Sequence, residues 1–100
     1  MTINKVEFRN QYKYFSGTVS QMVLTSRGVL HSININRATT TAIINIYDCN
    51  TTTAATTTNL VIQIENPGNR TVFFDCDMTS GCFINPTGSG VNFTVSYRPL

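Results

Sequence analysis

The sequence predicts an all-β domain: an antiparallel β-sandwich, jelly-roll-like, with about eight short strands. Apolar and polar residues alternate with a period of two in several short runs, which is the pattern of strands with one buried face. Turn signals containing Gly, Pro and Asn separate the runs at intervals typical of sandwiches and barrels. No stretch repeats its apolar residues with the period of a helix. The strands must then be buried by packing two sheets or by closing a barrel, and we expect the sandwich.

The length of the chain limits how many domains it can form. It has 100 residues, which is the size of one domain with one modest core. We therefore expect a single domain over residues 1–100.

The last strand shows the clearest alternation. Apolar residues recur at every second position from Val91 to Tyr97, the turn at 88–90 precedes them, and Pro99 ends the run. Between Val29 and Ile35 the alternation is broken once, because Leu30 lies on the opposite face from its apolar neighbours. The other expected strands are 3–9, 12–15, 18–24, 29–36, 41–47, 60–65, 71–75 and 81–84. Turns are expected at 66–69, where Pro-Gly fits type II, and at 85–88.

The expected core consists of the inward-facing apolar positions of these runs. Its members are Val29, Ile33, Ile35, Ile44, Ile46, Leu60, Ile62, Ile64, Val72, Phe74, Val91, Phe93 and Val95.

The composition narrows the classes of partner. Charged residues make up 12% of the chain, against about 25% in a typical soluble domain, and Thr, Asn and Ser take their place. Such neutral hydrogen-bonding side chains suit a protein that lies against other protein. The seven Lys and Arg residues are spread out, so we expect no nucleic acid partner. We also expect no membrane span and no signal peptide, and hence synthesis in a cytoplasm.

No catalytic or metal-binding motif emerges from the sequence. His31 is the only His, and Ser32 follows it directly, so in a strand the two side chains point to opposite faces. The run from Asp75 opens like a calcium loop, but its sixth position is Ser80 and its twelfth is Pro86. We therefore expect a protein that is not an enzyme and has no cofactor or metal. Asp75 and Asp77 are expected at a strand end, where they accept hydrogen bonds from turn amides.

The other notable features of the sequence are its cysteines, a Thr-rich run and an aromatic cluster. The three cysteines, Cys49, Cys76 and Cys82, are an odd number without a signal peptide, so we expect reduced thiols. The Thr-rich run 51–58 is expected to be a solvated loop, the alternative being a contact loop ordered only in an assembly. The aromatic cluster around Tyr12, Tyr14 and Phe15 is interpreted as an edge strand packing on its own core, the alternative being a platform on which a sugar stacks.

Several of these strands together carry a resemblance to a known group of proteins. They are residues 28–36, 44–48, 71–75 with Gly81 and Phe83, and 91–98. Over roughly residues 20 to 98 the chain resembles small β-sandwich virion proteins of tailed bacteriophages, of the capsid decoration (cement) type.

The resemblance implies a function, partners and a location. It implies a structural protein that binds the assembled capsid surface and bridges subunits of the major capsid protein, as a homo-oligomer, with a trimer favoured. The expected location is the virion, after synthesis in the host cytoplasm. Residues 1–15 are the candidate contact arm, although an ordinary first strand is equally compatible. The expected contact residues are Lys5, Phe8, Arg9, Tyr12 and Tyr14. The alternative function is a receptor- or carbohydrate-binding module of a phage tail or fibre.

Overall fold

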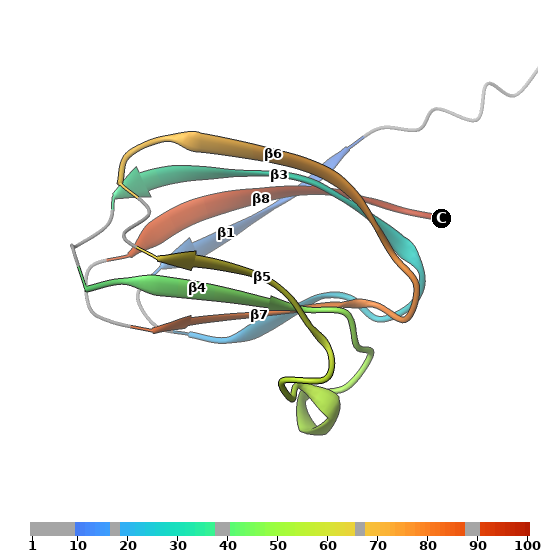
Figure 1. Cartoon of the computed structure of the whole chain (residues 1–100). Helices are drawn as coiled ribbons and strands as arrows, with labels where there is room; N and C mark the ends of the chain where they lie inside the picture. Colours follow the sequence, from blue (N-terminus) through green and yellow to red (C-terminus); the bar gives the residue numbers. More distant parts are fainter. Residues whose placement is uncertain (1–9, 17–18, 38–40, 66–67, 88–90) are drawn as a thin grey trace, which may run out of the picture.

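Eight strands form two four-stranded antiparallel sheets that lie face to face (Figure 1). The computed structural model describes residues 10–16, 19–37, 41–65, 68–87 and 91–100. The strands are β1 (Gln11–Ser16), β2 (Gln21–Leu24), β3 (Gly28–Arg37), β4 (Ile43–Tyr47), β5 (Leu60–Glu65), β6 (Thr71–Met78), β7 (Cys82–Thr87) and β8 (Asn92–Pro99). One short 3-10 helix, η1 (Thr52–Ala54), lies between β4 and β5. The predicted antiparallel β-sandwich is confirmed, and the described residues contain no apolar helix of membrane-spanning length.

The strands pair in a nested order. Sheet A has the order β1-β8-β3-β6, and sheet B has the order β2-β7-β4-β5. The first strand thus pairs with the eighth, the second with the seventh, the third with the sixth and the fourth with the fifth. Every connection except the one between β4 and β5 therefore carries the chain from one sheet to the other.

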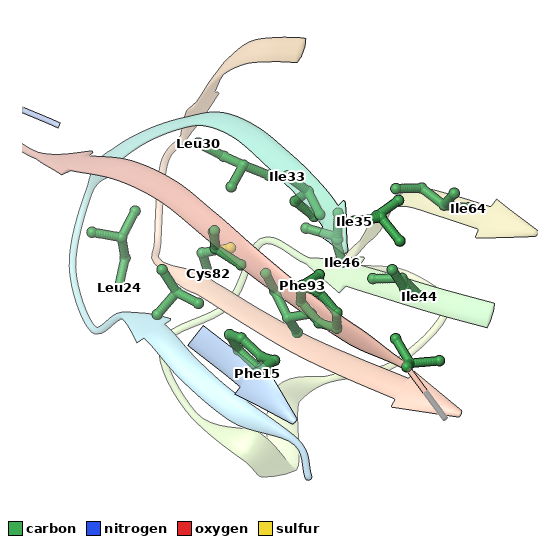
Figure 2. Close-up of a cluster of buried hydrophobic side chains, with 14 of the residues drawn as sticks. Phe15, Leu24, Leu30, Ile33, Ile35, Ile44, Ile46, Ile64, Cys82 and Phe93 are labelled. Carbon is green, nitrogen blue, oxygen red and sulfur yellow. The ribbon is translucent and has the colours of Figure 1, made fainter. Parts of the chain in front are cut away.

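The hydrophobic core fills the space between the sheets (Figure 2). Phe15 of β1 and Phe93 of β8 stack there, with their ring centroids 4.6 Å apart. Most of the predicted core is confirmed, with Ile62, Val72 and Phe74 partly buried at its margin, whereas the predicted Leu60 is half-buried and lies outside the core. The fully confirmed members are Ile33, Ile35, Ile44, Ile46, Ile64, Val91, Phe93 and Val95. Residues buried here but absent from the prediction are Phe15, Val23, Leu24, Leu30, Ala42, Met78, Cys82 and Ile84.

A bulge in β3 explains the error made around Val29. Leu30 pairs with Tyr97 of β8, but the next paired residue of β3 is Ser32, which lies opposite Ser96. The extra residue, His31, shifts the alternation by one position. Leu30 is therefore buried in the core together with Ile33, whereas the predicted Val29 faces outward and is only half-buried.

The predicted turn at residues 85–88 is wrong up to Thr87, because β7 continues through Pro86. Pro86 lies opposite Ile44 of β4, while the pairing of β7 with β2 ends at Ile84. Among the described residues, this part of β7 has a strand neighbour on one side only, which is the condition under which a sheet tolerates a proline. The predicted strand at 3–9 lies outside the described residues.

A carboxylate ties the two sheets together at one end of the sandwich. Asp48, just after β4, accepts hydrogen bonds from the Thr79 amide (3.0 Å), the Thr79 hydroxyl (2.9 Å), the Ser80 amide (2.8 Å) and the Gly81 amide (3.3 Å). The three residues that donate these bonds form the link between β6 of sheet A and β7 of sheet B. A Cβ atom on Gly81 would lie 2.5 Å from the Cys49 carbonyl oxygen, so this close approach requires glycine.

The Thr-rich loop is held by its own hydrogen bonds. The Asn59 side chain donates to the Ala54 carbonyl oxygen, and the Asn59 amide donates to the Thr56 carbonyl oxygen at 2.9 Å. The loop surrounds η1 and projects beyond sheet B (Figure 1). These bonds favour the expected solvated loop over a loop that becomes ordered only in an assembly.

Candidate functional site: the outer face of sheet A

The outer face of sheet A consists of two central rows of side chains that cross all four strands. The register places Tyr12, Ser96, Ser32 and Phe73 side by side in one row. The next row contains Tyr14, Thr94, Asn34 and Thr71. Small or neutral polar residues thus occupy the two central strands of both rows, while aromatic residues lie only on the edge strands β1 and β6.

The aromatic side chains on this face are strongly exposed. Tyr12 is 71% exposed, Phe73 is 68% exposed and Tyr14 is 55% exposed. They are three of the six large hydrophobic residues that the described part of the chain leaves exposed. Single exposed apolar residues are ordinary, but several on one face mark a surface suited to contact with another molecule.

The two serines in the middle of the first row are buried. Ser96 is 5% exposed and Ser32 is 7% exposed, because the larger residues around them cover them. The Ser96 hydroxyl has no hydrogen-bond partner within the described residues. A buried hydroxyl without a partner costs free energy, so the centre of this face is not optimised for the isolated chain.

Two side-chain pairs that each contain an acidic residue border the two rows at one end. His31 Nδ1 hydrogen-bonds to the Asp75 carboxylate, and the His31 ring meets the Phe73 ring edge to face at 5.7 Å. Arg27 donates two hydrogen bonds to Asp77, at 2.9 and 3.3 Å. Both acidic residues lie within β6, so the prediction that they sit at a strand end and bind turn amides is wrong. Asp48 has that role instead.

The bulge in β3 has a counterpart in β6. Between the pairs Ser32–Phe73 and Leu30–Cys76, β6 contains one residue more than β3. Asp75 lies in this segment with a φ of 48°, in the left-handed region that Asp tolerates better than most residues do. The two irregularities place His31 beside Asp75.

In the part of the chain that the structure describes, the His31–Asp75 pair lacks the third member of a hydrolytic triad. A triad needs a hydroxyl or thiol bonded to the second nitrogen of the imidazole. Among the described residues, no Ser, Thr or Cys side chain is hydrogen-bonded to the His31 ring. The same part of the chain also contains no cluster of three or more His, Cys, Asp or Glu residues that could hold a metal ion.

The predicted contact residues fall into two groups. Tyr12 and Tyr14 lie exposed on the outer face of β1, whereas Lys5, Phe8 and Arg9 lie outside the described residues. The end of the candidate arm, from Gln11 onward, is a strand of the sandwich itself and pairs with β8. Phe15 belongs to the core, so it cannot serve in a sugar-stacking platform.

The sequence reasoning missed Phe73. A signal was present, because Phe74 was assigned to the core and strict alternation then turns Phe73 outward. That Tyr12 and Phe73 lie in one row, by contrast, could not be predicted. It depends on the strand order β1-β8-β3-β6, which brings residues about 60 positions apart into the same row.

Comparison with known proteins identifies no relative of this chain: no family model, no curated protein and no solved structure matches it.

Proposed function

We propose that the chain is a structural virion protein that binds the surface of an assembled bacteriophage capsid and bridges capsid subunits. The observation that carries this proposal is the outer face of sheet A, where exposed aromatic residues flank a centre of neutral hydrogen-bonding side chains. The partner in this proposal is the major capsid protein.

The composition of this face suits a protein partner. Interfaces are depleted of charged residues at their centre and enriched in Tyr and Phe, which often supply much of the binding energy. The rows through Ser96 and Thr94 contain no charged residue, so binding there would not require the desolvation of a charge. The bordering pairs Arg27–Asp77 and His31–Asp75 would form a polar rim.

The topology supports the same proposal. We interpret the nested pairing of the eight strands as that of a jelly roll, an architecture that recurs in viral capsid and lectin domains. Fold alone does not establish function, so the proposed function depends on the residues of the outer face of sheet A.

A carbohydrate- or receptor-binding module is the second candidate. It is favoured by the first row, in which Tyr12 and Phe73 lie at opposite ends with two serines between them. Three strand spacings separate these aromatic residues, or about 14 Å, which leaves room for a sugar between them. Aromatic rings on which a sugar can stack are exposed on this face, and the neighbouring row contributes the less buried hydroxyls of Thr71 and Thr94.

Co-sedimentation with purified virions tests the first proposal. We expect the wild-type chain to bind at a copy number in the hundreds, measured by mass spectrometry of the particles. Thr94→Arg places a bulky charge at the centre of the outer face of sheet A and should weaken binding by roughly tenfold or more. Gln63→Arg makes the same change on the outer face of sheet B and is the matched control, expected to bind normally.

The role of the contact arm needs a separate variant. Deletion of residues 2–9 removes Lys5, Phe8 and Arg9 and leaves β1 intact. We expect this deletion to abolish particle binding while far-UV circular dichroism still reports a folded β-domain. Unchanged binding by the truncated chain would exclude the arm. Unchanged binding by Thr94→Arg, together with retention on a glycan array that Tyr12→Ala abolishes, would favour the carbohydrate module.

A further inference from the structure

The exposed aromatic residues of sheet A share an uncommon placement. Tyr12 and Tyr14 lie on β1 and Phe73 lies on β6, and these are the two edge strands of the sheet. All three side chains point to the outer face. Within the described residues, β1 pairs only with β8 and β6 pairs only with β3, so each edge has one side without a strand neighbour.

The strand directions make these two edges complementary. Each neighbouring pair in sheet A is antiparallel, so β1 and β6 run in opposite directions across the four strands. If a second copy is placed beside the first in the plane of the sheet, its β1 therefore runs antiparallel to β6 of the first. In that arrangement the outer faces of both copies lie on the same side.

We infer that β6 of one copy pairs antiparallel with β1 of a second copy, so that sheet A continues from molecule to molecule. The register that best covers the aromatic residues places Phe73 opposite Tyr14 of the second copy. It also places Thr71 opposite Ser16, and Phe74 opposite Lys13. Cross-strand aromatic pairs of this kind stabilise antiparallel sheets, and strand addition supplies backbone hydrogen bonds.

The charges on the two edges agree with this register. Asp75 and Asp77 lie beyond Phe74. Because both are acidic and the backbone of Asp75 is left-handed, the pairing would end there. Charged residues and bulges commonly prevent edge strands from pairing, but here they leave the segment from Thr71 to Phe74 unobstructed. The only charged residue of β1 is Lys13, and no like charge faces it in this register.

Such an interface joins two different surfaces of the same chain. Interfaces of this type form closed rings when the rotation between copies closes and open filaments when it does not. A closed ring of three copies would agree with the trimer expected from the resemblance. The inference goes beyond the proposed capsid function and does not depend on it, because self-association occurs without a particle.

Sedimentation velocity over a range of concentrations tests the interface. We expect the wild-type chain to form species larger than a monomer, and Phe73→Lys and Tyr14→Lys each to weaken this association at least tenfold. Val61→Lys changes an exposed apolar residue on β5, the edge strand of sheet B, and should have no effect. A wild-type chain that stays monomeric up to its solubility limit would overturn the inference, as would unchanged association of Phe73→Lys.

Disulfide trapping tests the pairing of unlike edges. In a Cys76→Ala background, Phe73→Cys and Tyr14→Cys are made in separate chains and oxidised alone or mixed. Because residue 73 of one copy lies opposite residue 14 of another, we expect the mixture to give the cross-linked heterodimer. Dimers that form as readily from Phe73→Cys alone would indicate a two-fold interface and overturn the inference. Thr94→Arg should associate normally, so failure of the capsid proposal and failure of this inference give different results.

Discussion

The outer faces of both sheets carry hydrogen-bonded amides, on sheet A from Thr71 to Asn34 at 2.7 Å and from Asn34 to Asn36 at 3.1 Å, but the two faces differ at their centres. On sheet B, a row of amides crosses three strands, and Gln63 donates to Asn45 at 2.8 Å while Ser20 donates to Asn85 at 2.6 Å. On sheet A, the central Ser96 hydroxyl has no partner among the described residues. The aromatic residues differ in the same sense, because Phe83 of sheet B is buried beside Tyr47 whereas Phe73 of sheet A is exposed.

This difference bears on which of the two faces is better suited to contact another molecule. Amides bonded within the chain are common to both faces and do not distinguish them. Exposed aromatic residues, such as Tyr12 and Phe73 of sheet A, lose contact with water when another molecule covers them, which favours binding on that face. The exposed aromatic residues therefore support the proposal that a partner binds on sheet A. We therefore expect the two sheets to differ in the reactivity of their thiols, in the effect of removing a carboxylate and in the effect of removing a serine hydroxyl.

The largest expected effect concerns the cysteines of the two sheets. Burial raises the pKa of Cys82 to about 12, with smaller contributions from Asp48 and the other two cysteines. Cys82 is fully buried on β7, a central strand of sheet B, whereas Cys76 lies half-buried on β6, the edge strand of sheet A. Burial also raises the pKa of Cys76, but its partial exposure leaves it accessible. We expect iodoacetamide to modify Cys76 of the native protein roughly a hundredfold faster than Cys82, because the thiolate reacts.

Peptide mapping of timed reactions measures these rates. Equal rates would show that sheet B opens as readily as the edge of sheet A and would break the comparison. Alkylation under denaturing, non-reducing conditions should add three groups, as expected for the three free thiols of the structure. Addition of a single group would reveal a disulfide.

The next effect concerns the carboxylate that ties the sheets together. Partial burial raises the pKa of Asp48, but hydrogen bonds from Ser80, Thr79 and Gly81 outweigh it, so the pKa lies below its ordinary value of 3.8. The carboxylate therefore stabilises the fold fully above about pH 4, and this contribution is lost as the pH falls through the lowered pKa of the folded state. Asp48→Asn removes one acceptor and should lower the free energy of unfolding by about 2 kcal/mol at pH 7.

Urea unfolding at pH 7 and pH 3 measures both effects. The difference in stability between Asp48→Asn and the wild type should shrink at pH 3, because the Asp48 carboxylate of the unfolded chain, with an ordinary pKa of about 3.9, is then mostly protonated. Asp75→Asn alters an exposed carboxylate of sheet A and serves as the control, with a smaller loss expected at pH 7. An equal loss in both variants would mean that the Asp48 hydrogen bonds are no more important than a surface ion pair.

Local sequence patterns accounted for the strands but not for their irregularities. Alternation around Ile44 and Phe93 correctly identified buried positions, because each side chain in a regular strand faces opposite to its neighbours. The same rule failed at Val29, since a bulge at His31 depends on how β3 meets β8 and β6. It failed at Pro86 for a related reason: whether a strand can contain proline depends on where its neighbour ends.

The candidate face was only partly predictable. Tyr12 and Tyr14 could be identified, because a Tyr-x-Tyr pattern in a short strand turns both rings to one side. Their relation to Phe73 and Ser96 could not, since these residues meet only through the strand order of the sheet. The same applies to Asp48, whose partners lie more than 30 positions away.

The smallest expected effect compares one substitution on the two faces. Ser96→Ala removes a buried hydroxyl that has no partner among the described residues, so the folded chain loses no hydrogen bond and no longer buries an unsatisfied group. We expect Ser96→Ala to leave the free energy of unfolding unchanged or to raise it by up to about 1 kcal/mol. Ser20→Ala removes the donor to Asn85 near the amide row of sheet B and should lower it by about 0.5–1 kcal/mol. Thermal and urea unfolding of both variants measure the two values. The sign of the difference between the two variants is the decisive result. A loss of stability in Ser96→Ala as large as that in Ser20→Ala would mean that the Ser96 hydroxyl is already hydrogen-bonded. The centres of the two outer faces would then no longer differ.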